Sequence, residues 1–261
     1  MVLSKYRCLC GRTAAFFLTL ALLLGSLFLP VAMASNVSIT PVQLNLGGRM
    51  RSQLITVGNN SDQATRFLVR ATGWRMDEEG NIQFLDDDQL IIYPASFSLP
   101  GRSTQNIRVG TAVGPADSEK TWRVVLEELP DPDAVIANGS AVNVLSTITV
   151  PVFMPPVSVH RSMAMTVSRI SGRTAEVTLT NEGNVHELML AVALTAFKGA
   201  QALQKVQVEG WYLLPSHRRS LGLQGAGAWC SLGADRFEIN VTTSASGAVA
   251  SRTLDAGQVC P

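Results

Sequence analysis

Short runs of alternating apolar and polar residues fill the chain beyond about residue 36. A period of two is typical of strands that bury one face. Turn-forming pairs such as Gly47-Gly48 and Pro100-Gly101 separate these runs. The first seven predicted strands are Val37–Leu46, Ser52–Asn59, Thr65–Trp74, Leu90–Ser98, Ser103–Gly110, Lys120–Leu129 and Val142–Met154. Short strands at this spacing predict an immunoglobulin-like sandwich.

Met154-Pro155-Pro156 interrupts the pattern, because two prolines fix φ and remove two backbone donors. A second series of predicted strands follows: Ala164–Ile170, Ala175–Asn181, Glu187–Ala196, Ala202–Glu209, Ser216–Leu223, Asp235–Thr243 and one near Val249–Leu254. We therefore predict an all-β protein of two immunoglobulin-like β-sandwich domains. They span residues 35–156 and the smaller 157–261, and a short Pro-rich hinge joins them.

The first 34 residues have the composition of a cleaved secretory signal peptide. Three basic residues precede the uncharged apolar run Ala14–Leu29, and Ala32-Met33-Ala34 forms a small-residue cleavage site. The run is short for a membrane-spanning helix, which favours cleavage over the alternative of an uncleaved anchor. We expect an exported, soluble mature protein.

Removal of this leader changes the charge and the cysteine count. The chain has 21 Lys and Arg and 20 Asp and Glu, and the leader takes three bases, which leaves a net charge of −2. That balance argues against a strongly basic nucleic-acid binder. Cys8 and Cys10 also leave, so Cys230 and Cys260 remain. In an oxidising compartment a disulfide between them is favoured over a metal pair.

The sequence contains no recognisable catalytic or metal-binding constellation. The three histidines, His160, His186 and His217, have no metal-ligand spacing with one another, with Cys or with a carboxylate. Nucleophile elbows and phosphate-binding glycine loops are also missing. We predict no enzyme, no metal and no cofactor, with carboxylate pairs that meet only in the folded chain left open.

The stretch Val142–Met154 predicts a long strand with an almost wholly apolar face. Pro151 cannot donate to a ladder, which favours a sheet edge, and a long apolar edge strand invites pairing with other chains. Two interpretations stay open: an ordinary core strand, or a strand lent to another protein by β-augmentation. The residues on the apolar side are Val142, Val144, Ser146, Ile148, Val150 and Val152.

Several segments occur in the order and spacing of one protein family. They are P-A-S-F-S-L-P-G at Pro94–Gly101 with Q-N-I-R-V at Gln105–Val109, L-E-E-L-P at Leu126–Pro130, V-F-M-P-P at Val152–Pro156, L-T-N-E-G-N-V-H at Leu179–His186 and G-W-Y-L-L-P at Gly210–Pro215. Together with the first strand, Val37–Leu46, they resemble the PapD-like periplasmic chaperones of pilus assembly, in a divergent branch.

The resemblance implies donor-strand complementation. In that family a pilus subunit lacks the final strand of its sandwich, and the chaperone lays a strand of its own into the open groove. The resemblance further implies a periplasmic location, with pilus subunits and an outer-membrane usher as partners. An exposed apolar strand would also allow the free protein to self-associate. It implies no nucleic acid and no small-molecule substrate. The residues placed on the subunit-binding positions are Val142, Val144, Ser146, Ile148 and Val150.

The chain departs from the family at the charged pair that holds the subunit's terminal carboxylate. The family uses an Arg on the first strand and a Lys on the donor strand. Those positions here are Gln43 and Pro151, neither of which can form a charge-assisted bond. Arg123, on the strand next to the donor strand, is our candidate substitute, and a solvated edge arginine is the alternative interpretation.

Two other functions stay open at this point. The runner-up is an exported two-domain β-sandwich adhesin or structural pilus component. An exported enzyme or ligand-binding sandwich is the third. A structural subunit would usually be one incomplete sandwich, so the number of complete sandwiches discriminates between it and a chaperone.

Overall fold

The computed structural model describes residues 36–130, 145–171, 173–225, 229–245 and 249–259. The predicted signal peptide, Val142, Val144 and Cys260 lie outside these ranges. No helix within the ranges is long and apolar enough to cross a membrane. The elements are β1 (Val37–Thr40), β2 (Leu44–Asn45), β3 (Ser52–Asn59), β4 (Thr65–Met76), β5 (Ile82–Leu85), β6 (Leu90–Tyr93), β7 (Ser96–Leu99), β8 (Thr104–Thr111), β9 (Lys120–Leu129), β10 (Thr147–Met154), β11 (Met163–Ser171), β12 (Thr174–Asn181), β13 (Glu187–Lys198), β14 (Gln201–Glu209), β15 (Tyr212–Leu213), β16 (Arg218–Gln224), η3 (Cys230–Leu232), β17 (Arg236–Thr243), β18 (Val249–Asp255) and α2 (Ala256–Val259).

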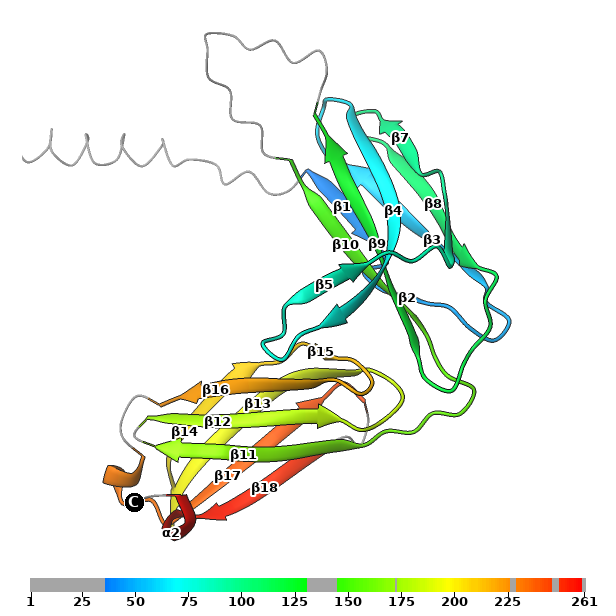
Figure 1. The fold of residues 1–261 in the computed structure, drawn as a ribbon. Coiled ribbons are helices and arrows are strands. Elements are labelled where there is room, and N and C mark those ends of the chain that lie inside the picture. The colour runs from blue at the N-terminus through cyan, green and yellow to red at the C-terminus, as the bar shows by residue number, and fades with distance from the viewer. Residues whose placement is uncertain (1–35, 131–144, 172, 226–228, 246–248, 260–261) are drawn as a thin grey trace, which may run out of the picture. The chain divides into compact units, whose positions relative to one another are not determined.

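Strands β1 to β10 form the two sheets of the first sandwich (Figure 1). One sheet has the order β1-β3-β8-β6, and the other has the order β2-β10-β9-β4-β5, with β7 paired to β4. Alternate residues of the strands meet in one core of branched and aromatic side chains, among them Ile107, Trp122 and Val124. The core residues come from the apolar side of each alternating run, because strand side chains alternate between the two faces of a sheet.

Strands β11 to β18 form the second sandwich. Its sheets have the orders β11-β12-β16 and β14-β13-β17-β18, with β15 paired to β13. They enclose a separate core that includes Trp229 and Phe237. The predicted all-β fold of two sandwiches is therefore confirmed. Cys230 lies in η3, and its predicted disulfide stays a prediction because Cys260 lies outside the described residues.

The structure differs from the predicted strands mainly at prolines. The predicted strand Val37–Leu46 is divided into β1 and β2 near Pro41, and Leu90–Ser98 is divided into β6 and β7 at Pro94. A proline has no N–H to donate, so it interrupts a ladder. Strand β5 was not predicted. It returns along β4 after the charged turn Asp77–Asn81.

Candidate functional site

Strand β10 lies near the edge of its sheet and is covered on one side only in part. It pairs antiparallel with β9 along its whole length, from Thr147 opposite Glu127 to Met154 opposite Lys120. On its other side, β2 pairs in parallel with Val152 and Phe153 alone. The backbone of residues 147–151 therefore borders no strand on that side within the described part of the chain.

The two halves of β10 differ in burial. Val150, Val152 and Met154 face the core of the first sandwich, and Val150 is only 2% exposed. Ser146 and Ile148 precede them on the same side and are half-buried. This placement revises the prediction for Val150, because its side chain is already occupied in the chain's own core. It leaves Ser146 and Ile148 accessible to another molecule.

Arg123 lies on β9 directly opposite Pro151 of β10, and it is only 3% exposed. Its guanidinium lies 4.2 Å from the centroid of the Trp74 ring, and its Nη1 donates to Thr149 Oγ1 at 2.7 Å. Its Nε and Nη2 are buried and have no hydrogen-bond partner among the described residues. Arg123 is therefore not a solvated edge arginine.

The charge on this guanidinium is not balanced locally. None of the ion pairs among the described residues includes Arg123. Burial lowers the pKa of Arg123, and the nearby Tyr212 opposes that shift. Burial also raises the pKa of Tyr212, against a lowering effect of the Arg123 charge. The site thus combines a positive charge with two unpaired N–H donors, which is the environment that an anion favours.

Side chains from both sandwiches meet beside this site. The rings of Phe153 and His186 stack with their centroids 3.8 Å apart. The Tyr212 hydroxyl donates to Gln43 Oε1 at 3.1 Å. A single oxygen of Glu119 accepts the backbone N–H of His186 and contacts its Nδ1, each at 2.8 Å. Residues that follow β12 in the second sandwich are thereby tied to β10 and its neighbours in the first.

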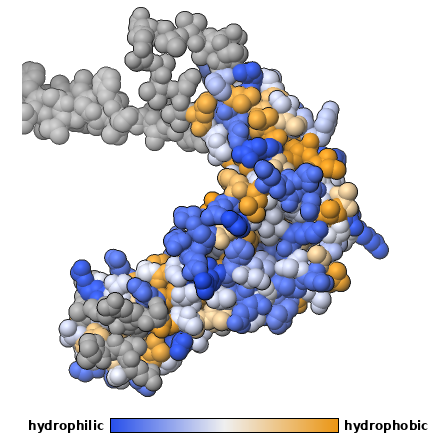
Figure 2. Space-filling model, in the orientation of Figure 1, coloured by the Kyte–Doolittle hydropathy of each residue, from blue (hydrophilic) through white to orange (hydrophobic). Residues whose placement is uncertain are grey.

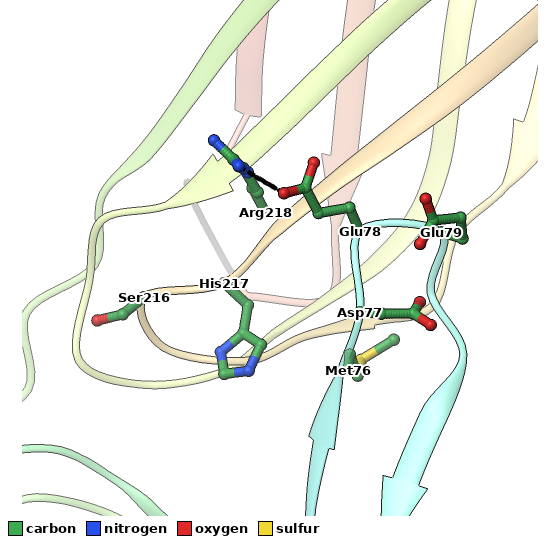
Figure 3. A pocket seen from close by; sticks show the side chains of 7 residues that line it. All are labelled: Met76, Asp77, Glu78, Glu79, Ser216, His217 and Arg218. Carbon is green, nitrogen blue, oxygen red and sulfur yellow. Dashed lines mark hydrogen bonds and ion pairs between the residues drawn. The ribbon is translucent and has the colours of Figure 1, made fainter.

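A second contact between the sandwiches lies at the tip of the β4–β5 hairpin (Figure 3). The backbone N–H of Ser220 donates to the Glu78 carbonyl at 2.9 Å, and Arg218 Nε donates to Glu78 Oε1 at 2.7 Å. Within the described ranges, no group of three or more His, Cys, Asp or Glu is placed to hold a metal ion. We assign no ligand to the adjoining cavity of about 420 Å³, which is lined by Met76, Asp77, Glu78, Glu79, Ser216, His217 and Arg218.

Sequence reasoning singled out Arg123 but missed the residues around it. Trp74, Thr149 and Tyr212 come from three strands that are far apart in the sequence, and only the fold brings them together. Tyr212 does lie within a segment that carries the family resemblance, but that segment gives no sign of its neighbours. Gln43, predicted at the family's first-strand anchor position, is indeed part of this group through its contact with Tyr212.

Comparison with known proteins identifies the family. Residues 36–160 match the model of the family described as pili and flagellar-assembly chaperone, PapD N-terminal domain. The first sandwich of this chain belongs to the PapD-like chaperones. The match covers the whole first sandwich, including β10 and Arg123. A comparison with curated proteins gave no significant match.

Solved structures resemble this chaperone over most of its length. A structure of the CsuC–CsuE chaperone–tip adhesin subunit complex from the archaic Csu pili of Acinetobacter baumannii is 14% identical, with a TM-score of 0.58, and the match covers 84% of this chain and 98% of that one. The Salmonella enterica SafA pilin complex with the SafB chaperone is 13% identical, with a TM-score of 0.52, over 86% and 98% of the two chains. The YadV chaperone is 12% identical, with a TM-score of 0.58, over 84% and 99%. These similarities show a shared two-sandwich fold.

The two complete sandwiches also separate the alternatives that the sequence left open. Each sandwich of the PapD-like chaperone has its own core. A structural pilus subunit would instead be one incomplete sandwich. The fold therefore favours the chaperone over the structural alternative.

Proposed function

We propose that this chaperone stabilises pilus subunits by donor-strand complementation, with β10 as the lent strand and with no catalytic step. Ser146 and Ile148 would enter the groove of the subunit, because they continue the inward side of β10 where it is only half-buried. Val142 and Val144 would extend the same alternating series, and Val150 is left out because it belongs to the chaperone's own core. The client is thus an immunoglobulin-like domain that lacks one strand.

The backbone directions in β10 support its role as an open edge. The Ser146 carbonyl accepts the N–H of Glu128 on β9 at 2.9 Å, so residues of its parity direct their backbone groups toward β9. Backbone directions alternate along an antiparallel strand, so Thr147, Thr149 and Pro151 direct theirs away from β9. The bond from Leu46 N–H to the Phe153 carbonyl, 2.8 Å, agrees with that alternation.

The same geometry explains why a chain terminus would lie beside Arg123. Strand β2 occupies the side of β10 at Val152 and Phe153, so an added strand can extend only as far as Pro151. A strand that runs in the direction of β10 would end there, against the start of β2. Its terminal carboxylate would then lie next to Arg123, which pairs with Pro151.

The observation that carries this proposal is the pair of donors that Arg123 leaves unpaired. Nε and Nη2 lie on the same edge of a guanidinium, and a carboxylate accepts such a pair through two parallel bonds. Nη1, on the other edge, is occupied by Thr149. Because the guanidinium is covered, a neighbouring side chain must move to admit the carboxylate. We expect it to be Tyr212, whose hydroxyl makes a long bond of 3.1 Å to Gln43.

An outer-membrane usher is the second proposed partner, and an exposed patch of the first sandwich supports that proposal. Leu54, Arg108 and Tyr93 lie side by side across β3, β8 and β6, and Ile91 lies next to them. Ile91 and Tyr93 are 64% and 77% exposed. Hydrophobic residues alternate with hydrophilic ones on the visible face of this sandwich (Figure 2). The patch belongs to the sheet that does not contain β10, so a bound client would leave it accessible.

The proposal also includes a periplasmic location and a disulfide between Cys230 and Cys260. A periplasmic protein needs an export signal, and residues 1–34 have the composition of one. The periplasm is oxidising, which favours a Cys230–Cys260 disulfide that closes a loop of about 30 residues. The open edge of β10 would also allow free chaperone molecules to pair with one another.

Coexpression of this chaperone with exported proteins encoded by neighbouring genes tests the proposal. We expect the mature chaperone to be purified in a 1:1 complex with a partner of about 100–150 residues, the size of one sandwich. Arg123→Gln should weaken the complex, and a client with two extra C-terminal residues should bind poorly because β2 blocks the extension. Arg70→Gln is the matched control, because Arg70 lies on the same sheet but is paired with Glu127 at 2.8 Å. A folded chaperone with no such partner would refute the proposal.

A further inference from the structure

We propose that the bound pilus subunit also covers a small apolar surface on the second sandwich, formed by Trp211 and Leu190. This inference rests on the proposed function, because the occupant is the subunit whose terminus lies at Arg123. Trp211 is 45% exposed and Leu190 is 51% exposed. Single exposed apolar residues are common on proteins, so the argument depends on how these two are connected to the anchor.

The two residues lie together at one end of strand β13. The Met189 N–H donates to the Trp211 carbonyl at 3.1 Å, and the Gly210 N–H donates to the Leu190 carbonyl at 3.3 Å. A side chain at Gly210 would collide with the backbone of Met189, so glycine is needed for this close approach. The approach sets the Trp211 backbone against Met189 and the Leu190 backbone against Gly210, so the two exposed residues lie on adjacent segments.

This surface is continuous with the proposed carboxylate anchor. The Trp211 ring contacts the Tyr212 ring, with centroids 5.7 Å apart and planes at 82°. Tyr212 in turn bonds Gln43 and interacts electrostatically with Arg123. A sandwich-sized client whose terminus is held at Arg123 would have its adjacent surface beside Tyr212, and Trp211 is the exposed apolar residue that contacts the Tyr212 ring.

Tryptophan fluorescence tests this directly, because the chaperone's other tryptophans are buried. Trp74, Trp122 and Trp229 are at most 3% exposed, so acrylamide quenching of the free chaperone reports mainly on Trp211. With a client that lacks tryptophan, we expect quenching in the complex to fall to the level of the Trp211→Phe chaperone. A complex that forms with unchanged quenching overturns the inference. If no complex forms with the unmodified chaperone, the proposed function fails instead.

A second measurement uses affinity. We expect Trp211→Ser combined with Leu190→Ser to weaken client binding by about tenfold, since tryptophan is a frequent source of interface binding energy. Leu232→Ser is the matched control, because Leu232 in η3 is a 46% exposed apolar residue of the same sandwich, and it should leave client affinity unchanged. Equal affinity for the double variant, or protection of Trp211 that depends on the concentration of free chaperone alone, overturns the inference. The latter result would assign the surface to a second copy of this chain.

Discussion

Replacing Arg123 with methionine separates a binding role of this residue from a structural one. In the client-free protein the guanidinium is buried with two unpaired donors. Each unpaired donor costs about 1–3 kcal/mol, and burying the charge costs several more. Against these stand one charge-assisted hydrogen bond to Thr149, worth about 1.5–3 kcal/mol, and the contact with Trp74, worth about 2 kcal/mol.

The balance favours the apolar side chain. Methionine has a similar length and keeps a favourable contact with Trp74, so we expect Arg123→Met to raise the free energy of unfolding by about 1–3 kcal/mol. For a chain of this size, each kcal/mol raises Tm by about 2–4 °C. The same substitution should weaken client binding by about 30-fold or more, because losing one partner of a buried charged pair costs about 2–5 kcal/mol.

The assay combines urea denaturation of the free chaperone with titration of a client subunit. Arg70→Met is the matched control, because Arg70 is a partly exposed arginine paired with Glu127, and we expect its unfolding free energy to change by no more than about 0.5 kcal/mol. The reasoning is refuted if Arg123→Met destabilises the chaperone and leaves client affinity unchanged. Arg123 would then be a structural cation.

Three further outcomes are expected. Ile148→Asp should abolish client binding with little loss of stability, whereas Val150→Asp should unfold the first sandwich by placing a charge in its core. Circular dichroism melts distinguish the two, and equal melts would mean that Ile148 is also core. Glu119→Gln should loosen the contact between the sandwiches, because it weakens the hydrogen bonds to His186. We expect faster hydrogen exchange at the His186 amide, and an unchanged exchange rate would contradict this. Because the folded-state pKa of Tyr212 is raised, the unfolded chain loses the phenolic proton first, so stability should fall as pH rises above about 10. Between about pH 9 and 11, the Tm of Tyr212→Phe should fall less than the Tm of the unmodified protein. Parallel curves of Tm against pH would contradict the role given to Tyr212.

The sequence predicted most of the fold, because alternation reports which face of a strand is buried. It could not show where along β10 the core ends. Val150 and Ile148 are alike in residue type and lie on the same side of the strand, yet one is buried and the other half-buried. That difference depends on which side chains cover each position in the assembled sandwich. For the same reason the sequence alone placed Val150 among the client-binding residues.

Arg123, the proposed carboxylate anchor, shows a second limit of prediction from the sequence. Comparison with the family pattern located the missing charges at Gln43 and Pro151, and proximity to β10 suggested Arg123. Nothing in the sequence shows that Arg123 is buried, because the ring that covers it belongs to Trp74 on β4 and its hydroxyl partner belongs to Thr149 on β10. Long-range side-chain contacts of this kind follow from register, and register is set only when the strands pair.

The hairpin tip that holds Ser220 has a consequence for solubility in a protein that must keep one strand available. Strand β16 ends its sheet, so its outer backbone groups form a template on which another chain can grow. The Glu78 carbonyl occupies one of these groups, and the Glu78–Arg218 ion pair keeps the tip in place. One sandwich thereby covers part of the other's border, and under the proposed function the open edge of β10 remains for incoming chains.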